Sequence, residues 1–122
     1  MADENNNIER APGTTTIAPN VLVTIAQLAA LRVNGVAGLA PLPASVNRLF
    51  RRGTGDGVSI DVKNGIVSAE LFLVYEPDSN MREVSRQVQE SVARAIEEMV
   101  GMSADRIDIH IQDVAYGDSG EE

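Results

Sequence analysis

The chain has 122 residues, a formal net charge of −8 at pH 7 and no cysteine. This length suits one domain, and the lack of cysteine excludes a disulfide framework, a cysteine nucleophile and a zinc–thiolate site. The negative balance argues against general nucleic-acid binding, because most of that affinity comes from Lys and Arg side chains that neutralise phosphates. Aromatic residues make up only 3% of the sequence, against 43% hydrophobic residues, so the core must be mainly aliphatic.

Both ends of the chain have the composition of disordered tails. Residues 1–12 are polar and lack the basic start and apolar run of a secretory signal, and residues 117–122 are acidic. We therefore expect a single domain over residues 13–116, in the cytoplasm. The longest nearly apolar segment, residues 21–31, is interrupted by polar side chains and is too short to cross a bilayer of about 30 Å as a helix.

The first predicted helix covers residues 19–35 and follows a short extended piece over residues 14–17. Pro19 suits the first helical turn, and Gly35 suits the C-terminal cap. Apolar residues recur at helical spacing and predict a broad buried face. The residues of this predicted face are Val21, Leu22, Ile25, Leu28, Ala29 and Val33.

Residues 36–42 predict a short strand, and residues 44–52 predict a short helix with a basic cluster. One interpretation is a contact for an acidic partner or for anionic lipid, to which each arginine would contribute about 1 kcal/mol. The other is a short helix whose apolar side chains pack into the core beneath solvated arginines. The glycine-rich residues 53–57 lead into a strand, which favours a flexible turn over a phosphate loop. The candidate contact residues are Arg48, Leu49, Phe50, Arg51 and Arg52.

A β-hairpin is the clearest local prediction in the sequence. Apolar and polar residues alternate over residues 58–63, and Asn64 and Gly65 form a strong hairpin-turn signal. The register that this turn imposes places Val58 opposite Leu71 and gives the hairpin one wholly apolar face.

The second hairpin strand continues through residues 71–75, beyond the end of its partner. Phe72 and Val74 then point to the outward face of the sheet. These side chains predict either pairing with another strand of the chain or a surface for self-association.

A long helix is predicted to begin after Asn80, which forms a capping box with Glu83, and to end at Gly101. Apolar residues at spacings of three and four predict its buried seam. This seam consists of Met81, Val84, Val88, Ser91 or Val92, Ala95 and Met99.

The last predicted strand covers residues 106–116 and alternates cleanly, with isoleucines inward and polar side chains outward. On its outward face, His110 with Asp108 is a layout that could bind a metal ion or a small ligand and so support an enzyme. One histidine with one carboxylate falls short of the three protein ligands of a typical catalytic zinc site, and a solvent-facing histidine is the simpler interpretation. We predict no catalytic residue, cofactor, metal or small-molecule substrate, and we expect a protein that is not an enzyme.

These elements together predict an α+β fold. Two helices would pack on one face of a mixed, mainly antiparallel sheet of about four to five strands. The predicted element order is β-α-β-β-α-β, with the hairpin in the middle.

Several motifs in this order resemble the alkaline shock protein family of Gram-positive bacteria, also called the general-stress or envelope-stress-response family. The resemblance covers about residues 13–114. The sequence differs from the family pattern at Ala18, where a serine is frequent, and at Glu76-Pro77, where a glycine-containing turn is usual. The motif residues are Val33, Gly35, Val36, Gly38 and Leu39, then Asn80, Val84, Val88 and Gln89, and finally Ile109, Ile111, Asp113 and Val114.

The resemblance implies a non-enzymatic cytoplasmic protein linked to cell-envelope and alkaline stress. Some members of the family self-associate and are held peripherally at the membrane by a separate integral membrane partner. The family has no catalytic residues to carry over to this chain. The expected function is therefore that of an interaction or scaffold protein of envelope homeostasis.

Overall fold

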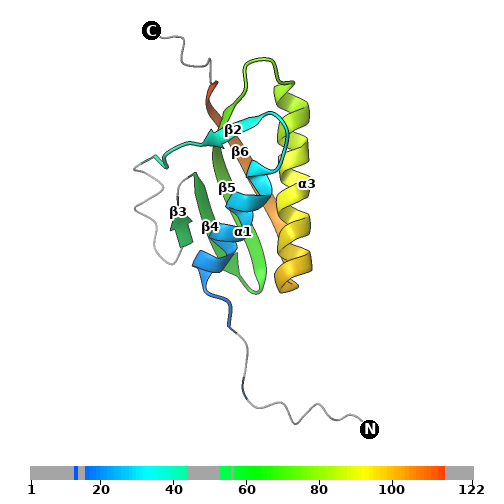
Figure 1. Cartoon of the computed structure of the whole chain (residues 1–122). Helices are drawn as coiled ribbons and strands as arrows, with labels where there is room; N and C mark the ends of the chain where they lie inside the picture. Colours follow the sequence, from blue (N-terminus) through cyan, green and yellow to red (C-terminus); the bar gives the residue numbers. More distant parts are fainter. Residues whose placement is uncertain (1–12, 14–15, 44–52, 56, 115–122) are drawn as a thin grey trace.

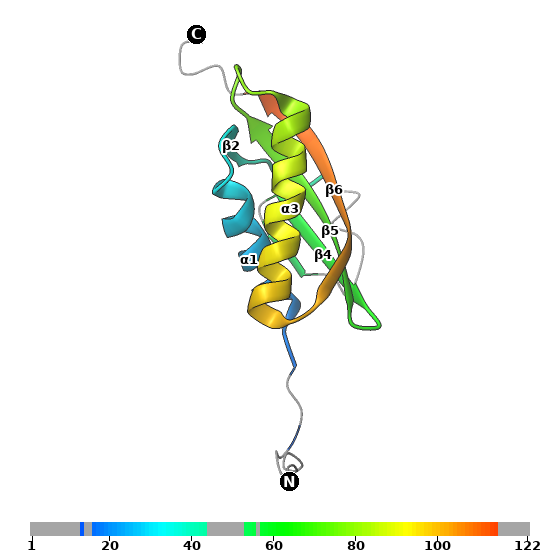
Figure 2. The same ribbon diagram turned by 90° about the vertical axis from the view of Figure 1, so that its right-hand side faces the viewer.

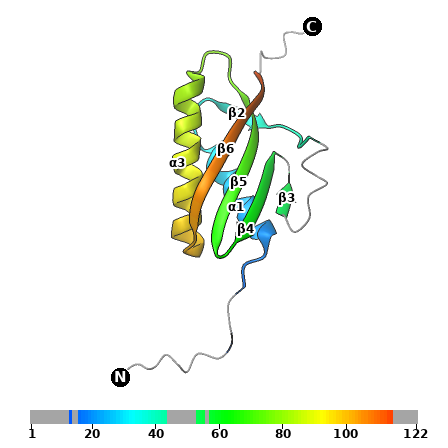
Figure 3. The same ribbon diagram turned by 180° about the vertical axis from the view of Figure 1, so that it is seen from behind.

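The computed structural model describes residues 13, 16–43, 53–55 and 57–114. Two helices cover one face of a five-stranded sheet (Figure 1). Figure 3 shows the opposite face of the sheet, with the strands nearest the viewer. None of the described helices covers this face. The elements are α1 (Pro19–Leu31), β2 (Val36–Leu39), β3 (Gly53–Gly55), β4 (Val58–Lys63), β5 (Ile66–Tyr75), α3 (Met81–Val100) and β6 (Ser103–Val114).

Strand β5 is the centre of the sheet. β6 runs parallel to β5 along its whole length and occupies one of its two edges. The antiparallel strands β4 and β2 therefore share the other edge end to end, β4 along its first part and β2 along its last residues. Between them, Phe72 N donates to Gly57 O at 2.7 Å, and Phe72 O accepts from Ala40 N at 2.8 Å. The mixed, mainly antiparallel α+β fold is confirmed.

The hairpin forms in the predicted register. Val58 pairs with Leu71, and Lys63 pairs with Ile66 across the turn. Asn64 and Gly65 both have positive φ angles, 54° and 78°, as a tight hairpin turn requires. Local turn chemistry and alternation were thus sufficient to predict this part of the sheet.

Helix α3 also has its predicted ends. Asn80 Oδ1 accepts a hydrogen bond from Glu83 N at 3.1 Å, and Gly101 caps the C-terminus with a φ of 74°. The predicted seam holds along the middle of the helix, whereas Met81 and Met99, in its first and last turns, are 37% and 67% exposed. The buried side chains of α3 are Val84, Val88, Val92 and Ile96.

Helix α1 differs from its prediction in length and in orientation. It ends at Leu31 instead of residue 35, and the chain passes close to α3 at Gly35, where a Cβ atom would lie 2.5 Å from Val84 Cγ2. The predicted buried residues Val21 and Leu28 are 46% and 56% exposed. The predicted residues Leu22, Ile25 and Ala29 are buried, and Val23, Ala26 and Ala30 are buried with them.

Thr16 and Ile17, the described part of the extended piece expected before the first helix, belong to no strand. One further prediction was wrong. Gly53–Gly55, expected to be a flexible exit, forms β3 and pairs antiparallel with the start of β4. An edge strand needs only backbone hydrogen bonds from one side, so glycines can join it despite their low strand propensity.

The main core lies between the helical layer and the sheet. α1 and α3 lie next to each other on one face of the sheet, and Figure 2 shows the two helices beside each other. Ser91 Oγ of α3 donates to Ala29 O of α1 at 3.0 Å, which ties the two helices together through small residues. The predicted tails, residues 1–12 and 117–122, lie outside the described residues.

Candidate interaction surfaces

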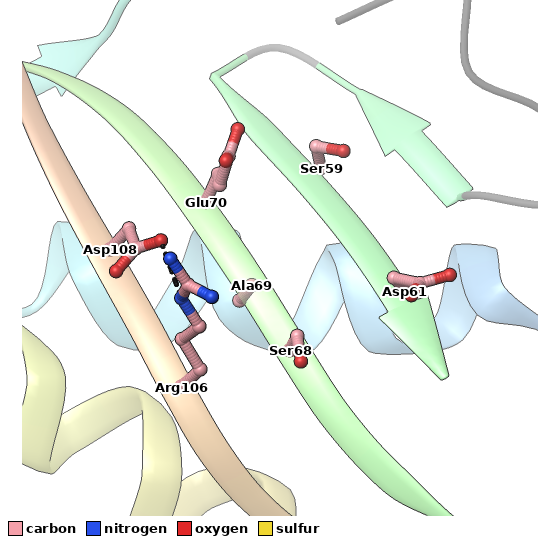
Figure 4. Close-up of a pocket in the computed structure, with 7 residues that line it drawn as sticks. All are labelled: Ser59, Asp61, Ser68, Ala69, Glu70, Arg106 and Asp108. Carbon is pink, nitrogen blue, oxygen red and sulfur yellow. Dashed lines mark hydrogen bonds and ion pairs between the residues drawn. The ribbon is translucent and has the colours of Figure 1, made fainter. Parts of the chain in front are cut away.

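The open face of the sheet carries a shallow polar hollow of about 230 Å³ (Figure 4). On the β6 side of the hollow, Arg106 Nε donates to Asp108 Oδ2 at 3.0 Å. Carboxylates outnumber the guanidinium, so the hollow is acidic and would attract cationic groups. Its lining residues are Ser59, Asp61, Ser68, Ala69, Glu70, Arg106 and Asp108.

Phe72 points to the open face as predicted, but it is buried, with 5% of its surface exposed. It packs with Ala40 in a second, smaller apolar cluster whose rim is formed by Leu42 and Val74. The ring of His110 stacks on Phe72 at a centroid distance of 4.5 Å and an interplanar angle of 10°. This cluster gives the outer face of the sheet a local core of its own.

Val74 takes up the first of the two predicted alternatives, because it pairs with another strand of the same chain, opposite Gly38 of β2. Its side chain is half-buried. Self-association through Phe72 and Val74 stays a prediction, and the burial of Phe72 makes Val74 the more accessible of the two contacts.

His110 and Asp108 both lie on the open face, two positions apart on β6, and each has another partner. The His110 ring stacks on Phe72, and Asp108 binds Arg106. Within residues 13, 16–43, 53–55 and 57–114, no three His, Asp or Glu side chains are grouped so as to hold a metal ion.

The basic cluster from Arg48 to Arg52 lies outside the described residues. The predicted contact with an acidic partner or with anionic lipid therefore stays a prediction.

The outer face of α3 is a charged surface on which Arg86 pairs with two carboxylates. Arg86 lies 2.6 Å from Glu83 Oε2 and 2.7 Å from Glu90 Oε2. The hydrogen bond from Arg86, followed by one from Gln87, lowers the pKa of Glu83 to about 2. The side chains of Arg86, Glu83 and Glu90 are 45–60% exposed, so this face of α3 is in contact with solvent.

The outer edge of β6 carries features that discourage pairing with another strand. In the part of the chain that the structure describes, β6 pairs only with β5. Gln89 Nε2 of α3 donates to Ile107 O at 3.0 Å, in a groove of about 310 Å³ between α3 and β6. The pairing of β6 with β5 shifts its register near both ends of β6. Arg106 and Asp108 add charge to the strand. Bulges and charges of this kind are common protections of sheet edges.

The outer face of α1 is the surface that the sequence prediction missed. Val21, Leu28 and Leu31 are 46%, 56% and 45% exposed. A helix that is apolar on nearly all sides buries more than one face in most proteins. That excess of apolar residues was the signal in the sequence that pointed to a second contact.

A comparison with protein families places these surfaces in context. The model of the alkaline shock protein 23 family, described by a cell envelope-related function, matches residues 7–116. This chain belongs to that family. The resemblance seen in the sequence motifs is confirmed, and a cell envelope-related role applies at the level of the alkaline shock protein 23 family.

Two bacterial relatives match most of the chain. YqhY of Bacillus subtilis is 29% identical over 112 residues, which cover 90% of this chain and 83% of YqhY. Spy1614 of Streptococcus pyogenes is 23% identical over 111 residues, which cover 88% of this chain and 92% of Spy1614.

Solved structures of MamM CTD share the fold. One variant is 16% identical with a TM-score of 0.54, over 76% of this chain and 93% of MamM CTD. Another variant, in a nickel form, is 14% identical with the same TM-score of 0.54, over 76% and 95% of the two chains. At this identity the likeness shows the fold alone. Among the helices of the described residues, none has the length and apolarity to cross a membrane.

Proposed function

We propose that this chain is a non-enzymatic interaction protein of the cell-envelope stress response and of envelope homeostasis. It acts by self-association and by binding a membrane-associated partner protein at the cytoplasmic side of the membrane. The observation that carries this proposal is the match of a family with a cell envelope-related function over residues 7–116. The match spans both layers of the fold and thus the whole described domain.

The surfaces of the domain support an interaction role. On the outer face of α3, Arg86 pairs with Glu83 and Glu90. Exposed aliphatic side chains gather on α1, and contiguous apolar surface of this kind commonly marks a protein contact. A protein with such faces is suited to hold partners together.

Binding to membranes from the native organism tests the proposal. We would incubate the purified chain with inside-out membrane vesicles, with the same vesicles after trypsin treatment, and with protein-free liposomes that contain anionic lipid. We expect co-sedimentation with the untreated vesicles and loss of binding after trypsin. This pattern assigns the attachment to a membrane protein.

Other outcomes would contradict the proposal. Equal binding to trypsin-treated vesicles and to liposomes would mean direct lipid attachment, and Arg51→Glu with Arg52→Glu would then test the basic segment. No binding to any membrane preparation would exclude a membrane-associated partner.

A further inference from the structure

We propose that two copies of this chain associate through the outer face of α1, with the two α1 helices packed side by side in antiparallel directions. The contact surface, named the α1 stripe, consists of Val21, Thr24, Leu28 and Leu31. This inference rests on the self-association in the proposed function and specifies its interface.

The α1 stripe is apolar and accessible. Its aliphatic members, Val21, Leu28 and Leu31, expose 46%, 56% and 45% of their surface. Thr24 Oγ1 donates to Asn20 O at 3.2 Å, so its hydroxyl already has a partner within the helix. Thr24 can therefore present its methyl group to a neighbour without leaving an unsatisfied donor.

The distribution of charge selects this surface for contact with a second copy. The chain carries a net charge of −8, so two copies repel each other wherever carboxylates face one another. No charged residue occurs from Ala11 to Leu31, whereas α3 and the open sheet face both carry carboxylates. Contact through the α1 stripe buries no charge and thus avoids the penalty of several kcal/mol for each unpaired buried ion.

The spacing of the α1 stripe matches itself in the antiparallel direction. Its positions follow one another at intervals of three, four and three residues, which read the same from either end. An antiparallel copy therefore places Val21 beside Leu31 of the partner subunit and Thr24 beside Leu28 of the partner subunit. Such a contact is two-fold symmetric, like the interfaces of most homodimers. The three–four spacing is also the one that packs helices side by side at 8–10 Å.

The other faces of the domain are less suited to a second copy. At the edge of β6, the Gln89 side chain already hydrogen-bonds to Ile107 O. On the open sheet face, Phe72 is buried. In contrast, Val21 and Leu28 of the α1 stripe are 46% and 56% exposed.

The size of the contact predicts a weak dimer. α1 has 13 residues and is therefore about 20 Å long. One helix pair of this length buries less than the roughly 800 Å² per partner of a standard stable interface. We therefore expect a dimer that dissociates on dilution.

Sedimentation velocity at several concentrations tests the interface with a matched pair of variants. Leu28→Glu adds charge to the centre of the α1 stripe and stands four residues before Arg32, a spacing that favours a helix-stabilising ion pair. Ile66→Glu is the control, because Ile66 is 41% exposed at the hairpin and pairs with Lys63. We expect Leu28→Glu to raise the dissociation constant at least about tenfold, or about 1.4 kcal/mol, and Ile66→Glu to leave it unchanged. Thermal unfolding of both variants checks that the fold is retained.

The outcomes separate this inference from the function on which it rests. Wild-type dimers that persist unchanged in Leu28→Glu would overturn the α1 stripe and leave self-association standing. A wild-type chain that stays monomeric at all concentrations would overturn self-association itself.

Cysteine cross-linking tests the antiparallel arrangement, since the chain has no cysteine of its own. We expect a mixture of Thr24→Cys and Leu28→Cys chains to form disulfide-linked dimers faster than either chain alone. Faster linking within the separate samples would indicate a parallel contact and contradict the proposed arrangement. Linking no faster than in Ile66→Cys would overturn the interface.

Discussion

Gly57 allows β4 and β2 to share one edge of β5. Its φ of +70° is in the left-handed region, and a Cβ atom there would lie 2.8 Å from both Phe72 O and Leu39 Cβ. Its carbonyl also accepts the hydrogen bond from Phe72 N at 2.7 Å. A side chain at this position would strain the backbone and separate the strands.

Replacing Gly57 tests this role. We expect Gly57→Ala to lower the free energy of unfolding by about 1–3 kcal/mol through backbone strain, with a further loss from the contact to Phe72 O. Gly65→Ala is the control, because Gly65 also has a positive φ but has open space around it. We expect Gly65→Ala to cost about 1 kcal/mol. Urea unfolding measures both, and equal losses would mean that the contact at Gly57 does not matter.

Tyr75 is a second residue whose environment predicts a measurable effect. It is fully buried, and its hydroxyl lies 2.7 Å from Ser85 Oγ. Burial raises the pKa of Tyr75 above its ordinary value of 10.0, because phenolate is disfavoured away from water, and the Ser85 hydrogen bond offsets part of this rise. Ionisation is therefore harder in the folded chain than in the unfolded chain.

This pKa difference predicts a loss of stability in alkali. The contribution of neutral Tyr75 is complete below pH 10.0 and is lost as the pH rises toward the raised folded pKa. We expect the stability advantage of the wild type over Tyr75→Phe to be smaller at about pH 11 than at about pH 8. Urea unfolding of both proteins at each pH measures it, and a constant difference would contradict the prediction.

At the level of elements, α1 shows why helical periodicity left its orientation open. The helix has apolar residues on nearly every side, so several faces satisfy the spacing of a buried stripe. The small side chains of Ala26, Ala29 and Ala30 let α1 approach the sheet and α3 closely, and all three are buried. Leu28 lies on the opposite side of the helix and is 56% exposed.

Two leucines of α1 test this orientation. Leu22 is fully buried and Leu28 is 56% exposed. We expect Leu22→Ala to lower the free energy of unfolding by about 2–5 kcal/mol, as in other core truncations. Leu28→Ala should stay within about 0.5 kcal/mol when measured at concentrations where the chain is monomeric. Equal losses of unfolding free energy in the two variants would mean that Leu28 lies on the core-facing side of α1, as helical periodicity predicted.

At the scale of the whole molecule, the net charge of −8 opposes self-association. Raising the salt concentration from 0.1 M to 1 M shortens the Debye length from about 10 Å to about 3 Å and so screens this repulsion. We expect the dimer dissociation constant to fall with added NaCl, because the α1 stripe itself contains no charge. Sedimentation equilibrium at both salt concentrations measures it. A weaker dimer in high salt would instead indicate a contact that depends on ion pairs.

The candidate surfaces could be predicted only in part. The outward direction of Phe72 followed from strand alternation, but its burial depends on Ala40, which approaches from a distant part of the sequence. The place of Gly53–Gly55 in the sheet likewise depends on β4, which supplies its hydrogen-bond partners. Contacts between segments far apart in the chain leave no local pattern to read.

The sequence by itself determined the features that depend on neighbours along the chain. These include the Asn64-Gly65 turn and its register, the Asn80 and Gly101 caps of α3, and the motifs that identify the family. Only the tertiary structure decided which face of α1 meets the core, because that choice depends on how closely the helix packs against α3 and the sheet. The same packing leaves Leu28 and Leu31 exposed, and it therefore creates the apolar surface that we assign to a second copy.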